Sequence, residues 1–141
     1  MDTRFSTAIH ILIMIAGDPN PIASEKIAES VGTNASYIRK ILSLLRKNGI
    51  IASRQGVEGF KLLVKPEELS LSRVYSALYD TEKVHLFDLH QNPSDKCIVG
   101  RHIRPVLSDV FKEVERRAED EMRETTLFDC MNKMRVLIDK E

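Results

Sequence analysis

The sequence is poor in the residues that cross-link a small protein or carry it through a membrane. Its 141 residues include only two cysteines, Cys97 and Cys130, too few for a disulfide framework. The longest apolar run, residues 8–16, contains His10 and is far shorter than the roughly 18 residues of a membrane span. Net charge is also absent, because 21 basic residues balance 21 acidic ones. These absences exclude a disulfide-rich domain and a membrane-spanning helix, and argue against indiscriminate binding to nucleic acid or anionic lipid.

Signatures of catalysis are lacking as well. The sequence has no glycine-rich phosphate loop, no metalloprotease motif and no nucleophile elbow. It also has no repeats or low-complexity tract, and its 43% apolar and 30% charged residues are typical of a soluble globular chain. Scarce cysteine fits a reducing compartment. We therefore expect a cytoplasmic protein that is not an enzyme, carries no cofactor and forms one compact unit.

The charges that cancel overall are unevenly distributed along the chain. Residues 1–65 carry nine basic and five acidic side chains, a net of +4, which leaves residues 66–141 with a net of −4. Within residues 36–65 a single acid, Glu58, is outnumbered by seven basic side chains: Arg39, Lys40, Arg46, Lys47, Arg54, Lys61 and Lys65. This local excess can attract a polyanion, so only this part of the surface is a candidate for nucleic acid.

Periodic apolar residues predict three helices in the first 50 residues. They cover residues 3–17, a short second helix with Ser24 as its N-cap, and a third helix with Asn34 as its N-cap. A three-residue turn separates the second helix from the third, which is the helix-turn-helix pattern. The inward face of the third helix consists of Ile38, Ile41, Leu42 and Leu45. Its outward face is therefore polar and basic, with Ser36, Tyr37, Arg39, Lys40 and Ser43.

A hairpin follows the three helices. Two short runs rich in apolar and β-branched residues, 50–53 and 60–64, flank a glycine-containing loop at 54–59. A fourth helix is expected over residues 70–79, before a turn-rich stretch over residues 80–98. The expected fold class is mainly α with a small β-hairpin: a winged helix-turn-helix domain over residues 1–79. Residues 80–141 are expected to add a sensor loop and C-terminal dimerisation helices to the same compact unit.

The C-terminal region predicts a long helix and then a short one. Pro105 lacks a backbone N–H, so the long helix is expected to begin near it or to bend there. Thr126 and Asp129 resemble a capping box that opens the last helix, whose apolar positions are Leu127, Met131, Met134 and Leu137. The long helix carries an apolar stripe of Ile103, Leu107, Val110 and Val114. Such a stripe packs by default on its own domain. Because four helices and the wing already supply that core, we expect the stripe to join two chains in a homodimer.

The basic face predicts double-stranded DNA as the partner. The major groove admits one helix, whose side chains reach base edges while flanking cations bind phosphates. We expect the groove to receive Ser36, Tyr37, Arg39 and Lys40. We expect contacts with the phosphate backbone of the DNA, or with the neighbouring minor groove, from Arg46, Lys47, Arg54 and Lys61. The alternatives are a basic face that is merely solvated and a winged helix that binds another protein.

Residues 34–63, NASYIRKILSLLRKNGIIASRQGVEGFKLL, resemble the recognition helix and wing of the Rrf2 family of bacterial winged-helix transcription regulators, which includes the iron–sulfur-cluster regulators. The likeness rests on the run from SYI to LLRKNGII and on Gly56 and Gly59, and it extends through SLSRVYSAL to the TLFD motif. It implies a homodimer formed through the long C-terminal helix and repression from near-palindromic operators. The wing departs from the family pattern because it is less rich in glycine.

The cysteines mark a second departure from that family. Members that bind a cluster carry three closely spaced cysteines between the fourth helix and the long C-terminal helix. In this sequence only Cys97 lies between those helices, so the resemblance implies a cluster-free member. A ligand, metal or redox sensor over residues 85–102 is the main alternative, although the spacing of Cys97, His85, Asp88, His90 and His102 matches no established metal site. Cys97 precedes a helix N-terminus near basic side chains, which favours a reactive thiolate. The simpler interpretation, which we prefer, is a half-buried residue packed against Val99, and Cys130 is expected in the core.

Overall fold

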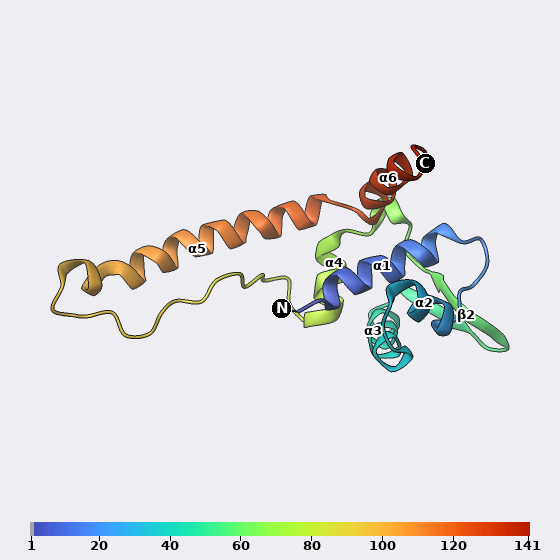
Figure 1. Ribbon diagram of the computed structural model, residues 1–141, viewed down its shortest axis with the longest axis horizontal. Helices are drawn as coiled ribbons and strands as arrows, with labels where there is room; N and C mark the ends of the chain where they lie inside the picture. The colour runs from blue at the N-terminus through green and yellow to red at the C-terminus, as the bar shows by residue number, and fades with distance from the viewer. Residues whose placement is uncertain (1) are drawn as a thin grey trace. The chain divides into compact units, whose positions relative to one another are not determined.

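The protein, in a computed structural model that describes residues 2–141, consists of two units. The first unit comprises the chain up to Glu82 together with Met122–Glu141, and the second comprises Lys83–Glu121. The first unit contains α1 (Arg4–Gly17), α2 (Ser24–Val31), α3 (Ala35–Lys47), β1 (Ile51–Arg54), β2 (Val57–Leu62), a 3-10 turn η1 (Pro66–Glu68), α4 (Leu71–Tyr79) and α6 (Leu127–Ile138). The long helix α5 (Ile98–Glu124) dominates the second (Figure 1). The expected mainly α fold with one hairpin is confirmed.

The core of the first unit forms where the apolar stripes of its helices meet. Its largest fully buried side chains include Ile11, Leu12, Ile15, Ile27, Ile38, Ile41, Leu42, Leu45, Ile50, Ile51, Leu69 and Leu127. Three helices and the start of the hairpin supply most of these, as their spacing predicts. Leu69 adds a residue from the short connection after η1. Burying each such side chain stabilises the fold by roughly 1.5–3 kcal/mol relative to leaving it exposed. This core holds α3 in place with one face left outside.

The hairpin is longer and its turn tighter than the sequence suggested. Strands β1 and β2 pair antiparallel from Ile51 opposite Leu62 to Arg54 opposite Val57, with a bulge at the end of β1. The expected loop over residues 54–59 is therefore wrong, because β2 already begins at Val57. Only two residues connect the strands, and Gly56 among them has φ +79°. A left-handed backbone at this position suits glycine, which has no Cβ to clash.

Helix caps confirm some of the predicted boundaries and correct others. Ala23 rather than Ser24 is the N-cap of α2, and no side chain caps that helix, so the prediction for Ser24 is wrong. The predicted capping box is confirmed: the Thr126 hydroxyl accepts from the Asp129 N–H at 3.1 Å, and the Asp129 carboxylate accepts from the Thr126 N–H at 2.9 Å. The apolar stripe of α6 is covered only in its first half. Leu127 is buried, whereas Leu137 is 67% exposed.

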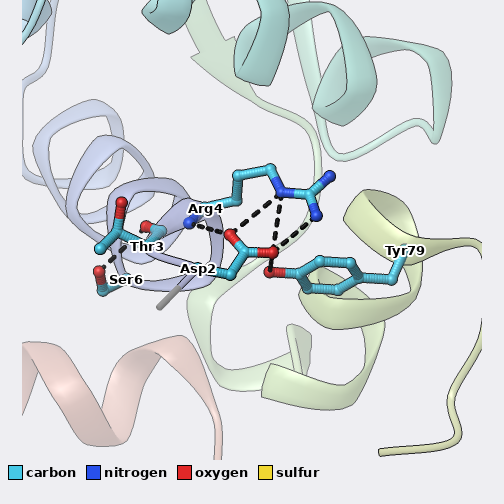
Figure 2. Close-up of polar contacts among 5 residues, drawn as sticks. All are labelled: Asp2, Thr3, Arg4, Ser6 and Tyr79. Atoms are coloured by element: carbon cyan, nitrogen blue, oxygen red, sulfur yellow. Dashed lines mark hydrogen bonds and ion pairs between the residues drawn. The ribbon is translucent and has the colours of Figure 1, made fainter. Parts of the chain in front are cut away.

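A polar cluster ties the beginning of α1 to the end of α4 (Figure 2). The Asp2 carboxylate accepts hydrogen bonds from the Arg4 guanidinium, the closest at 2.6 Å, and from the Tyr79 hydroxyl at 3.0 Å. The Arg4 guanidinium carbon also lies 4.7 Å from the centre of the Tyr79 ring, within the range of a cation–π contact. The hydrogen bonds from Arg4 hold the pKa of Asp2 well below its ordinary value. Nothing in the periodicity of the sequence signals this cluster.

The second unit pairs α5 with an irregular segment, residues 83–97, which we call the strap. The strap runs alongside α5 (Figure 1). Helix α5 begins at Ile98, so the expectation of a start near Pro105 is wrong. Pro105 sits inside the helix, where it deprives the carbonyl of Arg101 of a donor. Both residues are exposed, so water can bind that carbonyl. Among residues 2–141, no helix is long and apolar enough to span a membrane.

Candidate nucleic-acid interface

Local backbone chemistry sets the angle between α2 and α3. Gly32 ends α2 with φ +79°, and its N–H donates to the Ala28 carbonyl at 2.9 Å. The left-handed residue turns the chain sharply, as helix C-termini often require. Two residues later the Asn34 side chain accepts from the Tyr37 N–H at 2.8 Å, which confirms the predicted N-cap of α3. The result is a helix-turn-helix whose second helix starts at a defined point.

Helix α3 exposes the basic face that its periodicity predicts. Ile38, Ile41, Leu42 and Leu45 are buried, which places Ser36, Arg39 and Lys40 on the outside, all exposed. Tyr37 differs from the other predicted groove residues, because it is half buried and packs against the core. The Arg39 guanidinium donates to the Ser36 hydroxyl at 3.3 Å, so these two side chains lie together on the first turns. Arg46 and Lys47 are exposed at the C-terminal end, where cations also suit the helix dipole.

The wing adds further basic side chains next to α3. Arg54 is exposed at the end of β1, and the Arg46 guanidinium reaches the Ser53 hydroxyl at 3.4 Å, which links helix to wing. Between them lies a hollow of about 170 Å³ lined by Arg39, Leu42, Ser43, Arg46 and Phe60. Lys61 is exposed on β2, and its ammonium donates to the Pro19 carbonyl. A polyanion would therefore have to compete with that carbonyl for Lys61.

Close packing against the turn before α2 holds the wing in place. Phe60 and Ile22 form an isolated antiparallel bridge, with N–H to carbonyl distances of 3.0 and 3.4 Å. Gly59, at φ +110°, lies so near this turn that a Cβ there would be 2.8 Å from backbone atoms of Pro21 and Ile22. The glycine therefore permits the wing to approach. The sequence predicts a glycine in the hairpin loop here, whereas the close contact with residues 21 and 22 is a tertiary feature that gives Gly59 its role.

The predicted association stripe lies on α5 in the second unit. No residue of α5 is fully buried, and Val106, Val110 and Val114 are 55%, 49% and 42% exposed. Ile103 and Leu107 are half buried. The stripe is therefore only partly covered within the chain.

Cys97 lies in an exposed turn just before α5, so the expectation that it is half buried against Val99 is wrong. Hydrogen bonds from the backbone N–H groups of Gly100 and Val99 lower the pKa of its thiol. The other cysteine, Cys130, is half buried on α6 and is not part of the buried core, so the expectation that it lies in the core is wrong. The residues from 2 onward contain no group of three or more His, Cys, Asp or Glu side chains that could hold a metal ion.

Comparisons with known proteins agree with this geometry. A sequence model of the Rrf2 family, described as iron-dependent transcriptional regulators, matches residues 1–133. YwnA of Bacillus subtilis strain 168, named as an HTH-type transcriptional regulator, is 42% identical over 132 residues, covering 94% of this chain and 97% of YwnA. A crystal structure described as a DNA-binding protein has a TM-score of 0.69 at 38% identity and covers 91% of this chain and 98% of its own.

A further solved structure supports the fold alone. CymR, the global cysteine regulator of B. subtilis, has a TM-score of 0.71 at 18% identity, with 94% of this chain and 95% of CymR covered.

The iron in the family description raises the question of a cluster. Iron–sulfur clusters are held mainly by several cysteine thiolates. This chain has two cysteines, and they belong to different units. The donor set therefore does not fit such a cluster, and no step below is routed through iron.

Proposed function

This chain belongs to the Rrf2 family of transcriptional regulators, and we propose that it represses transcription as a homodimer bound to a near-palindromic operator. That it is a DNA-binding regulator follows from the family and its relatives. The finer statement is supported chiefly by one observation: the exposed basic face of α3 with a basic wing beside it. The activity we propose is binding rather than catalysis, and it takes place in the cytoplasm with the DNA.

The residues fall into two proposed roles. Side chains on the first turns of a recognition helix reach base edges, so Ser36, Tyr37, Arg39 and Lys40 are assigned to the major groove. Tyr37, being half buried, presents only its outer part. The phosphate backbone or minor groove is assigned to Arg46, Lys47, Arg54 and Lys61. Two-fold pairing through the α5 stripe would place two recognition helices about 34–36 Å apart, one helical turn of DNA.

Selection of bound sequences from random duplexes, at a stated salt concentration, tests the operator. We expect an enriched site with two-fold symmetry and a steep fall of log affinity with log salt, because several phosphates are neutralised. Affinity that does not depend on salt would favour a winged helix that binds protein instead. Repeating the titration with peroxide-treated protein tests the thiol alternative, for which identical affinities would count against any role of Cys97.

Two substitutions separate base reading from phosphate binding. Arg39→Ala is expected to cost about 1–3 kcal/mol on the selected site and to relax preference at one position. Lys47→Ala is expected to weaken binding to all sequences alike and to lower the salt slope by about one. Lys133→Ala, an exposed lysine on α6, serves as the control for loss of one positive charge. Equal losses on specific and random DNA for both test variants would contradict the groove assignment.

The homodimer is tested by sedimentation. One chain has a mass of 16.1 kDa, so the wild type is expected to sediment near twice that value at micromolar concentration. Val110→Asp would place a charge in the stripe and is expected to yield monomers, because burying an unpaired charge is costly. Val136→Asp is the matched control, since this valine of α6 is 54% exposed outside the stripe. A monomeric wild type would refute the dimer.

A further inference from the structure

The strap is attached to α5 through its backbone. Glu119 and Glu115 of α5 accept hydrogen bonds from the N–H groups of Val84 and Leu86, at 2.9 and 2.6 Å. Farther along, the Arg104 guanidinium donates to a strap carbonyl. An unstructured connector would leave such groups to water. Instead, three side chains of one helix bind three backbone groups of the strap, so strap and helix form one structure.

A groove remains between the strap and α5. It holds about 280 Å³, close to the lower end of small-molecule sites, and Phe87, Leu89 and Phe111 form its apolar wall. The rings of Phe87 and Phe111 have centroids 5.1 Å apart. Despite this contact, Phe87 is 48% exposed. Exposed apolar surface costs free energy, so a strap whose only role was to cover α5 would be expected to bury the Phe87 ring as well.

One positive side chain in the polar wall of the groove, Lys112, has no hydrogen-bond partner among residues 2–141, whereas both acids there, Asp88 and Glu115, already accept hydrogen bonds. Asp88 accepts from His85 at 2.7 Å, and the Glu115 carboxylate, already bound to the strap, lies 3.7 Å from the other His85 ring nitrogen. Lys112 and Ser108 line the same groove, and neither side chain hydrogen-bonds to another of the described residues 2–141. A cationic ligand would meet the Lys112 ammonium, and a metal ion would find no set of three ligands. An anionic group would find two donors.

We propose that this groove binds a small apolar monoanion, with its aromatic or aliphatic body against Phe87 and Phe111 and its carboxylate bound by Lys112 and Ser108. The regulatory consequence rests on the proposed function. Helix α4, which residues 80–82 connect to the strap, packs on α3. Through this connection we expect a ligand in the groove to change DNA affinity, in which case DNA changes ligand affinity by the same factor.

The first test uses matched probes with the intact, isotopically labelled protein. Benzoate, benzamide and benzylamine share a ring and differ in charge, and octanoate replaces the ring with an aliphatic chain. We expect benzoate or octanoate to shift the backbone amide signals of residues 85–91 and 104–115 in a saturable manner. Benzamide is expected to bind at least tenfold more weakly, and benzylamine not at all. Equal binding of acid and amide, saturable shifts elsewhere only, or no response to either acid would overturn the proposal.

The second test removes the proposed anion donor. Lys112→Ala is expected to weaken benzoate binding tenfold or more, because a hydrogen bond to a charged group is lost. Lys112 is exposed, so the variant should fold like the wild type, which circular dichroism checks. Lys133→Ala on α6 is the control and should bind benzoate unchanged. Wild-type affinity in Lys112→Ala would overturn the proposal, as would signals that vary with protein concentration alone, which would indicate a second chain in the groove.

A third measurement separates this inference from the function on which it rests. Operator affinity is measured without ligand and at saturating benzoate. If ligand-free protein fails to bind DNA, the proposed function is wrong, while the spectra still decide whether the groove binds anions. If it binds DNA equally with and without benzoate, the regulatory role is overturned. A change in operator affinity that Lys112→Ala abolishes would support both.

Discussion

Replacing Gly59 by alanine tests how the wing is held against the turn before α2. The new Cβ would lie 2.8 Å from backbone atoms of Pro21 and Ile22, closer than real Cβ contacts allow. Relief requires the wing to move away, which breaks the two hydrogen bonds between Ile22 and Phe60, worth about 1 kcal/mol each. Alanine at φ +110° adds about 1–2 kcal/mol of backbone strain. The expected loss of unfolding free energy is therefore about 3–4 kcal/mol.

Thermal unfolding followed by far-UV circular dichroism measures this loss. At roughly 4 °C per kcal/mol for a chain of this size, Gly59→Ala should lower the Tm by about 12–16 °C. Gly56→Ala is the matched control, because it has a similar positive φ but no atom within 4 Å of the new Cβ. Its Tm should fall by only about 4–8 °C, from strain alone. Equal losses in the two variants would refute the close approach of wing and turn.

Three further predictions follow from local contacts. Asn34→Ala removes the acceptor that caps α3 and should cost about 1 kcal/mol in chemical denaturation, with Asn34→Asp restoring most of it. Gly100→Ala would place its Cβ on the Ser94 carbonyl oxygen, so hydrogen exchange of the turn before α5 should quicken while the first unit is unaffected. The hydrogen bond that His85 donates to the Asp88 carboxylate raises the pKa of His85, so the stabilisation from this pair is full below pH 6.5 and disappears as pH rises through the raised pKa. An NMR titration should show that Asp88→Asn lowers the pKa of His85, and no change would contradict the pairing.

The helix-turn-helix was predictable because its determinants are local. The inward residues of α3 recur at helical spacing, and Asn34 caps the helix through a bond to a residue three positions away. Once one face is committed to the core, the outward position of Arg39 and Lys40 follows from geometry alone. The same reasoning places the capping box at Thr126 correctly.

Features that depend on tertiary context were missed. The start of α5 at Ile98 was not predicted, because proline is normally excluded from helix interiors, and only exposure makes Pro105 acceptable there. The half-buried position of Tyr37 depends on packing against the core, which periodicity does not resolve. The exposure of Leu137 follows from where α6 runs beyond its partners.

The candidate groove could not have been predicted from any pattern. An extended strap has no periodic signature, and the bonds that hold it join a side chain to a backbone group some 30 positions away. Such bonds place no demand on the identity of the strap residue that donates. The sequence indicated only a turn-rich stretch, and the distances between strap and helix define the site.

Because the strap is attached through its main chain, its side chains can be substituted without loss of the hydrogen bonds that hold it to α5. Attachment through side-chain packing would not allow this. Glu115 and Glu119 accept hydrogen bonds from backbone N–H groups, which every residue except proline possesses. Substitutions at Phe87 or Leu89 can therefore alter what the groove accepts while its scaffold stays intact. Under the proposed roles, a lineage can in this way exchange one ligand for another and leave the residues of α3 unchanged.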